Sequence, residues 1–223
     1  DEGKGSQVTI MKVSARTFTT ANPLLANPST ADKGKIVTVN STGTDLQYGP
    51  KVLKHNMNFK NIYDTGSFAV SGSTANNNPR VHDKMNITIT PQLTTSKVMI
   101  TVNMFGKIQT NQVLDTMAYL RRTVNGVVTD LLPPGVGNSN RGLGQFVLSH
   151  YAGSTDSSPE VCNFHYVDEP NTISEVRYDV LLVCDFDITF HYNKTIDSNN
   201  SNDANEERGT SFISAEEKFA NDD

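Results

Sequence analysis

NITITPQLTTSKVMITVNMF, residues 86–105, contains two runs of alternating apolar and polar residues, separated by a proline and a group of small hydroxyl side chains. Because successive side chains of a strand point to opposite faces, this stretch predicts two antiparallel strands that are each buried on one face. Pro91 cannot donate a ladder hydrogen bond, so the first strand is predicted to end there, with residues 92–96 as a short connection. The stretch therefore predicts a β-sheet protein.

The second of these strands has two different faces. The face predicted to enter the core consists of Val98, Ile100, Val102 and Met104. The face predicted to point outward consists of Met99, Thr101, Asn103 and Phe105. Because Met99 and Phe105 interrupt its polar residues, we expect another chain to cover this outward face, with these two residues at the contact.

The composition supports an all-β fold. Hydrophobic residues make up 36% and charged residues 19% of the 223 residues, both below the averages of about 45–50% and 25% for globular proteins. Thr, Ser and Asn fill the difference, which favours strands and polar loops over a helical bundle. The chain is long enough to bury a core as one large β domain, or as a smaller domain with an extension.

The charge and hydropathy pattern excludes two classes of partner. The net charge is −5 and the largest basic cluster is the pair Arg121–Arg122, so we expect no nucleic acid partner. The longest apolar runs, such as residues 180–184, are far shorter than the roughly 20 residues of a membrane span. The chain opens with Asp1-Glu2-Gly3, without Met or a signal region, so we expect it to be a processed form or a fragment.

Two cysteines are too few for a disulfide framework. Cys162 and Cys184 each lie in an apolar run that predicts a strand. The favoured interpretation is two buried free thiols, because free cysteine packs as a small hydrophobic residue. A single bridge between neighbouring strands is the alternative, since sequence cannot supply the separation of the two Cα atoms.

The chain is predicted to consist of two parts. Residues 1–50 form an extended N-terminal arm, because residues 17–34 contain two Asn-Pro steps and little periodicity. Residues 35–50 predict a small hairpin, with a strand at 35–39, a turn at 41–44 and a second strand ending at 49–50. Its apolar area is too small for independent folding, so we expect the arm to dock on another component.

Residues 51–223 are predicted to form a β-sandwich, because short alternating strands recur between turn signals. The predicted strands are 58–63, 67–70, 84–90, 97–107, 117–124, 127–132, 145–150, 161–166, 174–184, 186–192 and 210–215. Asn125-Gly126 between two alternating runs predicts a two-residue hairpin turn. Residues 72–80, 133–144 and 196–209 are predicted to be long polar loops.

Asp185, Asp187 and His191 are the candidate metal ligands. In a strand over residues 186–192, Asp187 and His191 share one face, and Asp185 extends the same pattern. Carboxylate and imidazole groups on a common face suit a divalent ion. The favoured alternative is the solvent face of an amphipathic strand whose other face enters the core.

Other polar residues give little support to catalysis. His165, Asp168 and Glu169 fit a packed histidine and a turn before Pro170 better than an acid–base site. Ser149 and His150 are adjacent, so on a strand they point to opposite faces and cannot form a nucleophile–base pair. No nucleophile elbow, phosphate loop or zinc spacing is present, so we expect no enzyme activity and no cofactor.

Several triplets match the N-glycosylation pattern, and we single out three of them. They begin at Asn40, Asn86 and Asn193. Such matches are frequent in a chain rich in Asn and Thr, so they are weak evidence of secretion.

The order of several short motifs resembles virion proteins of tailed bacteriophages, especially those of marine cyanobacteria. The motif residues are Thr90-Pro91, Ser96-Lys97, Leu120-Arg121-Arg122, Asp168, Pro170, Thr172, Tyr178 and Ser211-Phe212-Ile213. The resemblance covers most of residues 30–220 and implies a jelly-roll knob of the C1q/TNF type, carried on a tail fibre or capsid appendage. It also implies a homotrimer in which one sheet faces the threefold axis. The Asn-rich segment before the last strand and the acidic ending depart from this pattern.

The function implied by this resemblance is structural. The protein would be a non-enzymatic virion component, attached to other virion proteins by its N-terminal arm and displaying its knob toward a glycan or protein of the host surface. A capsid decoration without receptor binding is one alternative. The other is a lectin-like jelly roll that binds carbohydrate, with Asp185, Asp187 and His191 holding a metal.

Overall fold

The computed structural model describes residues 35–39, 46–51, 53–72, 78–109, 116–133, 144–148, 159–196 and 207–219. The chain divides into two compact units, Asp1–Lys54 and His55–Asp223. In the first unit, β1 (Lys35–Val39) pairs with β2 (Leu46–Lys51) in antiparallel fashion. These are the two strands of the predicted hairpin. Its predicted turn at 41–44 and the connector at 17–34 lie outside the described residues, and the docking of residues 1–50 stays a prediction.

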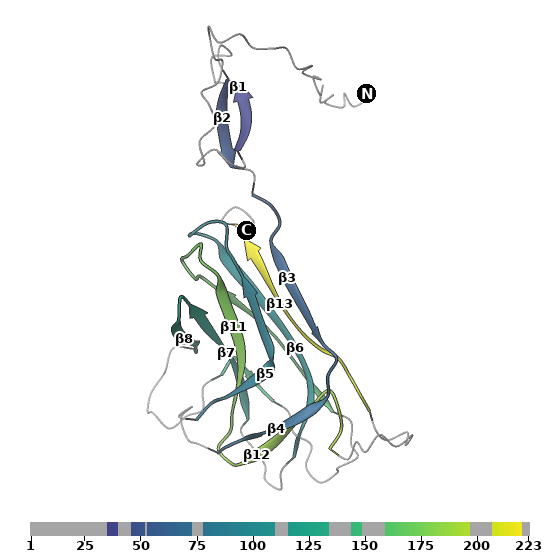
Figure 1. The fold of residues 1–223 in the computed structure, drawn as a ribbon. Helices are drawn as coiled ribbons and strands as arrows, with labels where there is room; N and C mark the ends of the chain where they lie inside the picture. The colour runs from purple at the N-terminus through teal and green to yellow at the C-terminus, as the bar shows by residue number, and fades with distance from the viewer. Residues whose placement is uncertain are drawn as a thin grey trace, which may run out of the picture. The chain divides into compact units, whose positions relative to one another are not determined.

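The second unit contains two antiparallel sheets that pack face to face (Figure 1). The first sheet consists of β3 (Met57–Ile62), β4 (Gly66–Val70), β6 (Lys97–Gln109), β10 (Glu160–Asp168), β12 (Ile188–Tyr192) and β13 (Ser211–Lys218). The second consists of β5 (Arg80–Ile89), β7 (Met117–Val124), β8 (Val127–Leu131), β9 (Phe146–Val147) and β11 (Val176–Val183). All elements in the described residues are strands, so the all-β prediction is confirmed.

Two long strands of the first sheet are each interrupted, so that β3 and β4 are the two parts of one and β12 and β13 the two parts of the other. β12 pairs with residues 106–109 of β6, and β13 pairs with residues 97–103 along the same edge of β6. On the side away from β6, β4 pairs with β12 and β3 pairs with β13. When β3 and β4 are counted as one strand, β12 and β13 as another, and the two-residue β9 is left out, eight strands remain. Numbered 1–8 in chain order, they have the orders 1-8-3-6 and 2-7-4-5 in the two sheets. This alternation of strands between two sheets is the jelly-roll arrangement, as predicted.

The core lies between the sheets and comes from the alternation of each strand. Its central members on β6 are Val98, Ile100, Val102 and Met104, the face that the sequence assigned to the core. Opposite them, β11 contributes Val176, Tyr178, Val180 and Leu182. Phe190 and Ile188 of β12 also enter this core. The strand period of two therefore placed the buried residues correctly.

The sandwich has two ends, which we call proximal and distal. At the proximal end β3 and β6 begin and β13 ends, while at the distal end β4 ends and β5 and β12 begin (Figure 1). The β7–β8 hairpin is proximal, and its turn residues Asn125 and Gly126 have positive φ values of 48° and 80°. These angles belong to the type I′ turn that the Asn-Gly pair predicted. Most of residues 133–144 and 196–209, and residues 149–150, lie outside the described part of the chain.

Candidate subunit interface

The outer face of the first sheet consists of side chains in aligned rows across four strands. At the proximal edge of this face Lys218 lies beside Lys97, and the first of the four rows that follow is Met57, Glu216, Met99 and Val167. The next two rows are Phe59, Ser214, Thr101 and His165, and then Asn61, Phe212, Asn103 and Asn163. Phe105 and Val161 form the fourth row. Met99 and Phe105 therefore point outward, as their positions in the sequence predicted.

The four rows of this outer face combine apolar and uncharged polar side chains, with Glu216 as their only acidic residue. Met57, Phe59, Val161 and Val167 are between 44% and 53% exposed, and Phe59 stacks on Phe212 with ring centroids 5.2 Å apart. The second, third and fourth rows contain no Asp, Glu, Lys or Arg side chain. Depletion of charge at the centre of a surface that exposes apolar residues is typical of protein–protein interfaces.

The outer face of the second sheet has the opposite character. Arg121 makes a bidentate pair with Asp130, with N–O distances of 2.6 and 3.0 Å. Arg177 pairs with Asp179 at 2.7 Å on the neighbouring strand. The two faces of one sandwich thus differ, and the face of the first sheet is the better candidate for burial against another subunit.

Phe105 is partly covered by its own chain. Gly209, which precedes β13, lies so close to the Phe105 ring that a Cβ atom at position 209 would clash with three ring carbons. Farther toward the distal end, Lys107 and His191 of the same face are buried within the chain. The uncovered part of the face therefore includes Met99 and Val167 near the proximal end, together with Val161, which is exposed beside Phe105.

Three residues of the quoted motifs meet between the sheets at the proximal end. Arg122 Nη1 donates to both carboxylate oxygens of Asp168 at 2.9 and 3.1 Å, and the hydroxyl of Tyr178 donates to the same carboxylate at 2.8 Å. Asp168 is only 5% and Tyr178 0% exposed. Burial and the adjacent Asp168 raise the pKa of Tyr178, so its hydroxyl stays protonated and donates. This bridge ties β10 to β7 and β11, and Asp168 ends a strand rather than occupying the predicted turn.

The metal candidates do not share a strand face. Asp185 and Asp187 lie exposed in the connection before β12, which begins at Ile188, so the predicted strand start at residue 186 is wrong. The carboxylate of Asp187 accepts a hydrogen bond from the Gly72 N–H at 2.8 Å. His191 is buried, with Nε2 2.9 Å from Oε1 of Gln109. Within the described residues, no three His, Cys, Asp or Glu side chains lie close enough to hold a metal ion.

The other residues singled out in the sequence have ordinary structural roles. His165 is exposed on the outer face, with Nδ1 3.0 Å from the Thr101 hydroxyl oxygen. Oε1 of Glu169 lies 3.6 Å from Nζ of Lys97. Both cysteines are buried free thiols, which confirms the favoured interpretation, and burial raises the pKa of Cys162 to about 12.

The predicted glycosylation triplets have different surroundings. Asn193 is 0% exposed, so it cannot accept a glycan in the folded protein. Asn86 is half-buried and accepts a hydrogen bond from Lys60. Asn40 lies outside the described residues.

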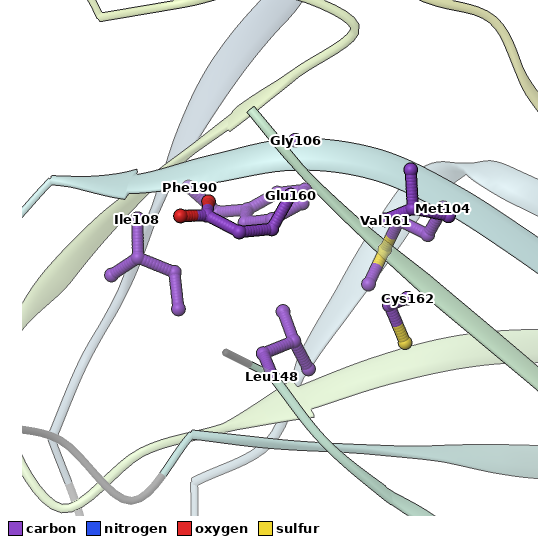
Figure 2. Close-up of a pocket in the computed structure, with 8 residues that line it drawn as sticks. All are labelled: Met104, Gly106, Ile108, Leu148, Glu160, Val161, Cys162 and Phe190. Carbon is purple, nitrogen blue, oxygen red and sulfur yellow. The ribbon is translucent and has the colours of Figure 1, made fainter. Parts of the chain in front are cut away.

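A small cavity lies between the sheets near β10. Figure 2 shows its lining, which is apolar except for the carboxylate of Glu160 and the thiol of Cys162. The cavity volume is about 10 Å³, which is the size of one water molecule and far below the roughly 300 Å³ of a small ligand pocket. The outer face of the first sheet is therefore the stronger candidate for a functional surface.

Val161 and Val167 are members of this surface that the sequence analysis did not single out. The signal was present in residues 161–168, where Val161, Asn163, His165 and Val167 alternate with core residues. Comparison with the outward face of residues 97–107 would have identified them, because β10 and β6 are neighbours in the sheet.

No family model and no curated protein matches the chain. Among solved structures, similar chains come from infectious bursal disease virus. The VP2 subviral particle has a TM-score of 0.34 and 8% identity, with coverage of 82% of this chain and 42% of that chain. The Gx strain has a TM-score of 0.32, 9% identity and coverage of 82% and 42%, and the T=1 particles have 0.34, 10%, 85% and 44%.

This chain thus spans less than half of the length of those viral chains. With TM-scores below 0.5, these similarities carry no argument about function, which must come from the residues themselves. No helix in the described residues is long and apolar enough to cross a membrane.

Proposed function

We propose that this protein is a non-enzymatic structural component of a virus particle, whose jelly-roll unit assembles as a homotrimer through the outer face of its first sheet. The proposal adopts the function implied by the resemblance to tailed-phage appendage proteins. The observation that carries it is the charge-poor face that exposes Met57, Phe59, Val161 and Val167 beside Met99.

This face supplies part of the area that a trimer contact needs. Taken over six residues of β3, eight of β13 and nine each of β6 and β10, at about 3.3 Å per residue and 4.8 Å between strands, it covers roughly 500 Å². Turned toward a threefold axis, three such faces would bury about 1,500 Å² in total, because each copy contacts two neighbours. A second copy of the chain is also electrostatically compatible with this face, because neither copy would bury an unpaired ion in its central rows.

The ends of the sandwich support a display role. His55, where the second unit begins, lies 3.1 Å from Glu216 at the proximal end, so the chain enters there. The strands that flank residues 71–79 and 110–116 end at the distal end. We propose that the N-terminal arm attaches to other virion proteins, and that segments at the distal end contact a glycan or protein of the host surface.

Light scattering on the full chain tests the trimer. A trimer has a mass of 3 × 24.4 = 73.2 kDa. Val167→Lys would bury an unpaired ammonium group at the contact and should weaken association about a hundredfold or more, so that monomers predominate at micromolar concentration. Circular dichroism should remain unchanged, since Val167 is 53% exposed.

Val128→Lys is the matched control. Val128 is also a valine on a strand, is 55% exposed, and lies on the outer face of the second sheet. It should leave the trimer intact. A monomeric or dimeric wild-type chain, or equal effects of the two substitutions, would contradict the trimeric assembly.

Purified virus particles test the virion assignment separately. Antibodies against the chain should label intact particles, and chemical cross-linking should join Lys4, Lys12 or Lys33 of the arm to other virion proteins. Particles without label would overturn the virion role whatever the oligomeric state. Cross-links confined to lysines after residue 54 would overturn the attachment role of the arm.

A further inference from the structure

The start of β5 contains an irregularity that turns a histidine into the core. Asp179 of β11 pairs with Asn86, but Leu181, two residues later, pairs with Val81 instead of residue 84. Three extra residues therefore form a bulge in β5, and His82 lies within it. Bulges re-aim side chains, and this one leaves His82 only 1% exposed.

Three aromatic rings surround His82. The ring centroid of Phe68 on β4 is 5.0 Å away at an interplanar angle of 67°, and that of Tyr192 on β12 is 5.0 Å away at 55°. The ring of Phe190 is 6.0 Å away at 69°. His82 thus packs the bulge of the second sheet onto two strands of the first sheet at the distal end.

The hydrogen bonds of His82 fit only the neutral ring. Its Nδ1 accepts a hydrogen bond from the Lys84 backbone N–H at 3.4 Å, so the proton of the neutral imidazole is on Nε2. Nε2 is buried without a hydrogen-bond partner. A second proton on Nδ1 would face the N–H of Lys84 and would place a full charge among aromatic rings, where water cannot solvate it.

The charged groups around the cage do not offer this charge a buried partner. On β5 itself, Arg80 lies 5.3 Å over the Phe68 ring and pairs with exposed Asp83, and Lys84 pairs with Asp64. From β3, Lys60 binds Asn86. The charge of Asp83 favours protonation of His82, whereas the charges of Arg80 and Lys60 disfavour it, and burial outweighs all three. From β4 and β12, the groups that face the ring are Phe68, Phe190 and Tyr192.

We propose that His82 is a proton-operated latch, whose protonation releases the β5 bulge from β4 and β12 and opens the distal end while the proximal half stays folded. The pairing of the strands makes local opening feasible. Within the described sheets β4 pairs only with β12, and the distal part of β5 pairs with β11 only through Val81 and Arg80. This latch does not depend on the proposed virion role.

The direction of the pH dependence follows from the two states of the ring. Burial, the largest cause, lowers the pKa of His82 from 6.5 to about 4 in the closed state, whereas an exposed ring keeps its ordinary value. The open state therefore binds more protons, so opening becomes more favourable as the pH falls below 6.5, and the effect levels off below pH 4. For these two values, the open-to-closed ratio rises about 20-fold between pH 7 and pH 5.

Hydrogen exchange by mass spectrometry on the full chain tests the latch. After correction for intrinsic exchange rates, amides of β4 and β12 should exchange about 20-fold faster at pH 5 than at pH 7, whereas those of β7 and the proximal half of β6 should not change. His82→Gln, or His82→Leu if the first variant does not fold, stays neutral and should abolish this acceleration. His165→Gln, at an exposed histidine, is the control and should retain it.

Three outcomes would overturn the proposal. One is an acceleration in His82→Gln or His82→Leu equal to that of the wild type, which would assign the effect to another group such as His191. The second is an equal loss of protection at both ends, which indicates global unfolding. The third is unchanged exchange of β4 and β12 at pH 5.

Discussion

Asp168→Ala should lower the free energy of unfolding of the second unit by about 3 kcal/mol, because breaking a buried ion pair leaves its partner charge uncompensated. The substitution removes the acceptor of two Arg122 hydrogen bonds and of the Tyr178 hydroxyl at once. Tyr178 is fully buried and cannot turn to water. The Arg122 side chain is 21% exposed, so water can solvate part of the unpaired guanidinium group. The loss of unfolding free energy should therefore lie at the lower end of the range for buried ion pairs.

Urea unfolding near neutral pH measures this loss, with Asp83→Ala as the control. Asp83 also makes a bidentate pair with an arginine, Arg80, but the two side chains are 65% and 40% exposed. An exposed pair contributes at most about 1 kcal/mol, so Asp83→Ala should have a small effect. If the two substitutions cost the same, the bridge between the sheets does not stabilise the fold.

The strands were predictable because their signals are local. The limits predicted for residues 117–124 match β7, and the Asn125-Gly126 pair marked the turn that follows. Period-two alternation also assigned Met99 and Phe105 to the outer face. Each of these features depends on residues within a few positions, which is the range over which backbone geometry fixes the direction of a side chain.

The bridge and the latch were not predictable from such patterns. Arg122 follows the core residue Leu120 at the same face of β7, where alternation alone predicts an apolar side chain. It is tolerated because Asp168 of the other sheet meets it, and this pairing spans 46 residues. His82 enters the core because the bulge inserts three residues, a choice that depends on the register with β11.

The strand predicted to carry the metal candidates was wrong for a related reason. Alternation continues from Asp185 through Tyr192, so the sequence predicts one strand that includes Asp187 and His191. The chain must reverse between β11 and β12, and residues 185–187 make that reversal. Local alternation does not reveal where a turn interrupts it when the turn lacks glycine and proline.

Asn193 lies where both long strands of the first sheet are interrupted, and its side chain bonds to the end of β3, to the segment between β3 and β4 and to the start of β13. Its amide nitrogen donates to the carbonyl oxygens of Ile62 and Asp64 at 2.7 and 2.9 Å. Its amide oxygen accepts from the Ser211 hydroxyl at 2.6 Å, and the Ser211 Oγ accepts in turn from the Phe105 N–H at 2.9 Å. One side chain thus satisfies backbone and hydroxyl groups that the regular ladder leaves unpaired.

Asn193→Ala should lower the free energy of unfolding by about 3 kcal/mol, because it leaves buried polar groups without partners. Asn193 also has a φ of 57°, a conformation that asparagine and glycine tolerate better than alanine. Asn193→Gly should therefore cost about 1 kcal/mol less than Asn193→Ala, since it removes the strain but not the loss of hydrogen bonds.

Asn171 supplies the matched control in urea unfolding. It has a similar φ of 53° and a side chain that donates to the Glu169 carbonyl oxygen at 2.9 Å, but it is exposed. Water replaces that bond in Asn171→Ala, so we expect a loss of about 1 kcal/mol, mainly from backbone strain. Equal losses at positions 193 and 171 would show that strain alone explains both, and that the buried hydrogen bonds of Asn193 do not hold the interrupted strands together.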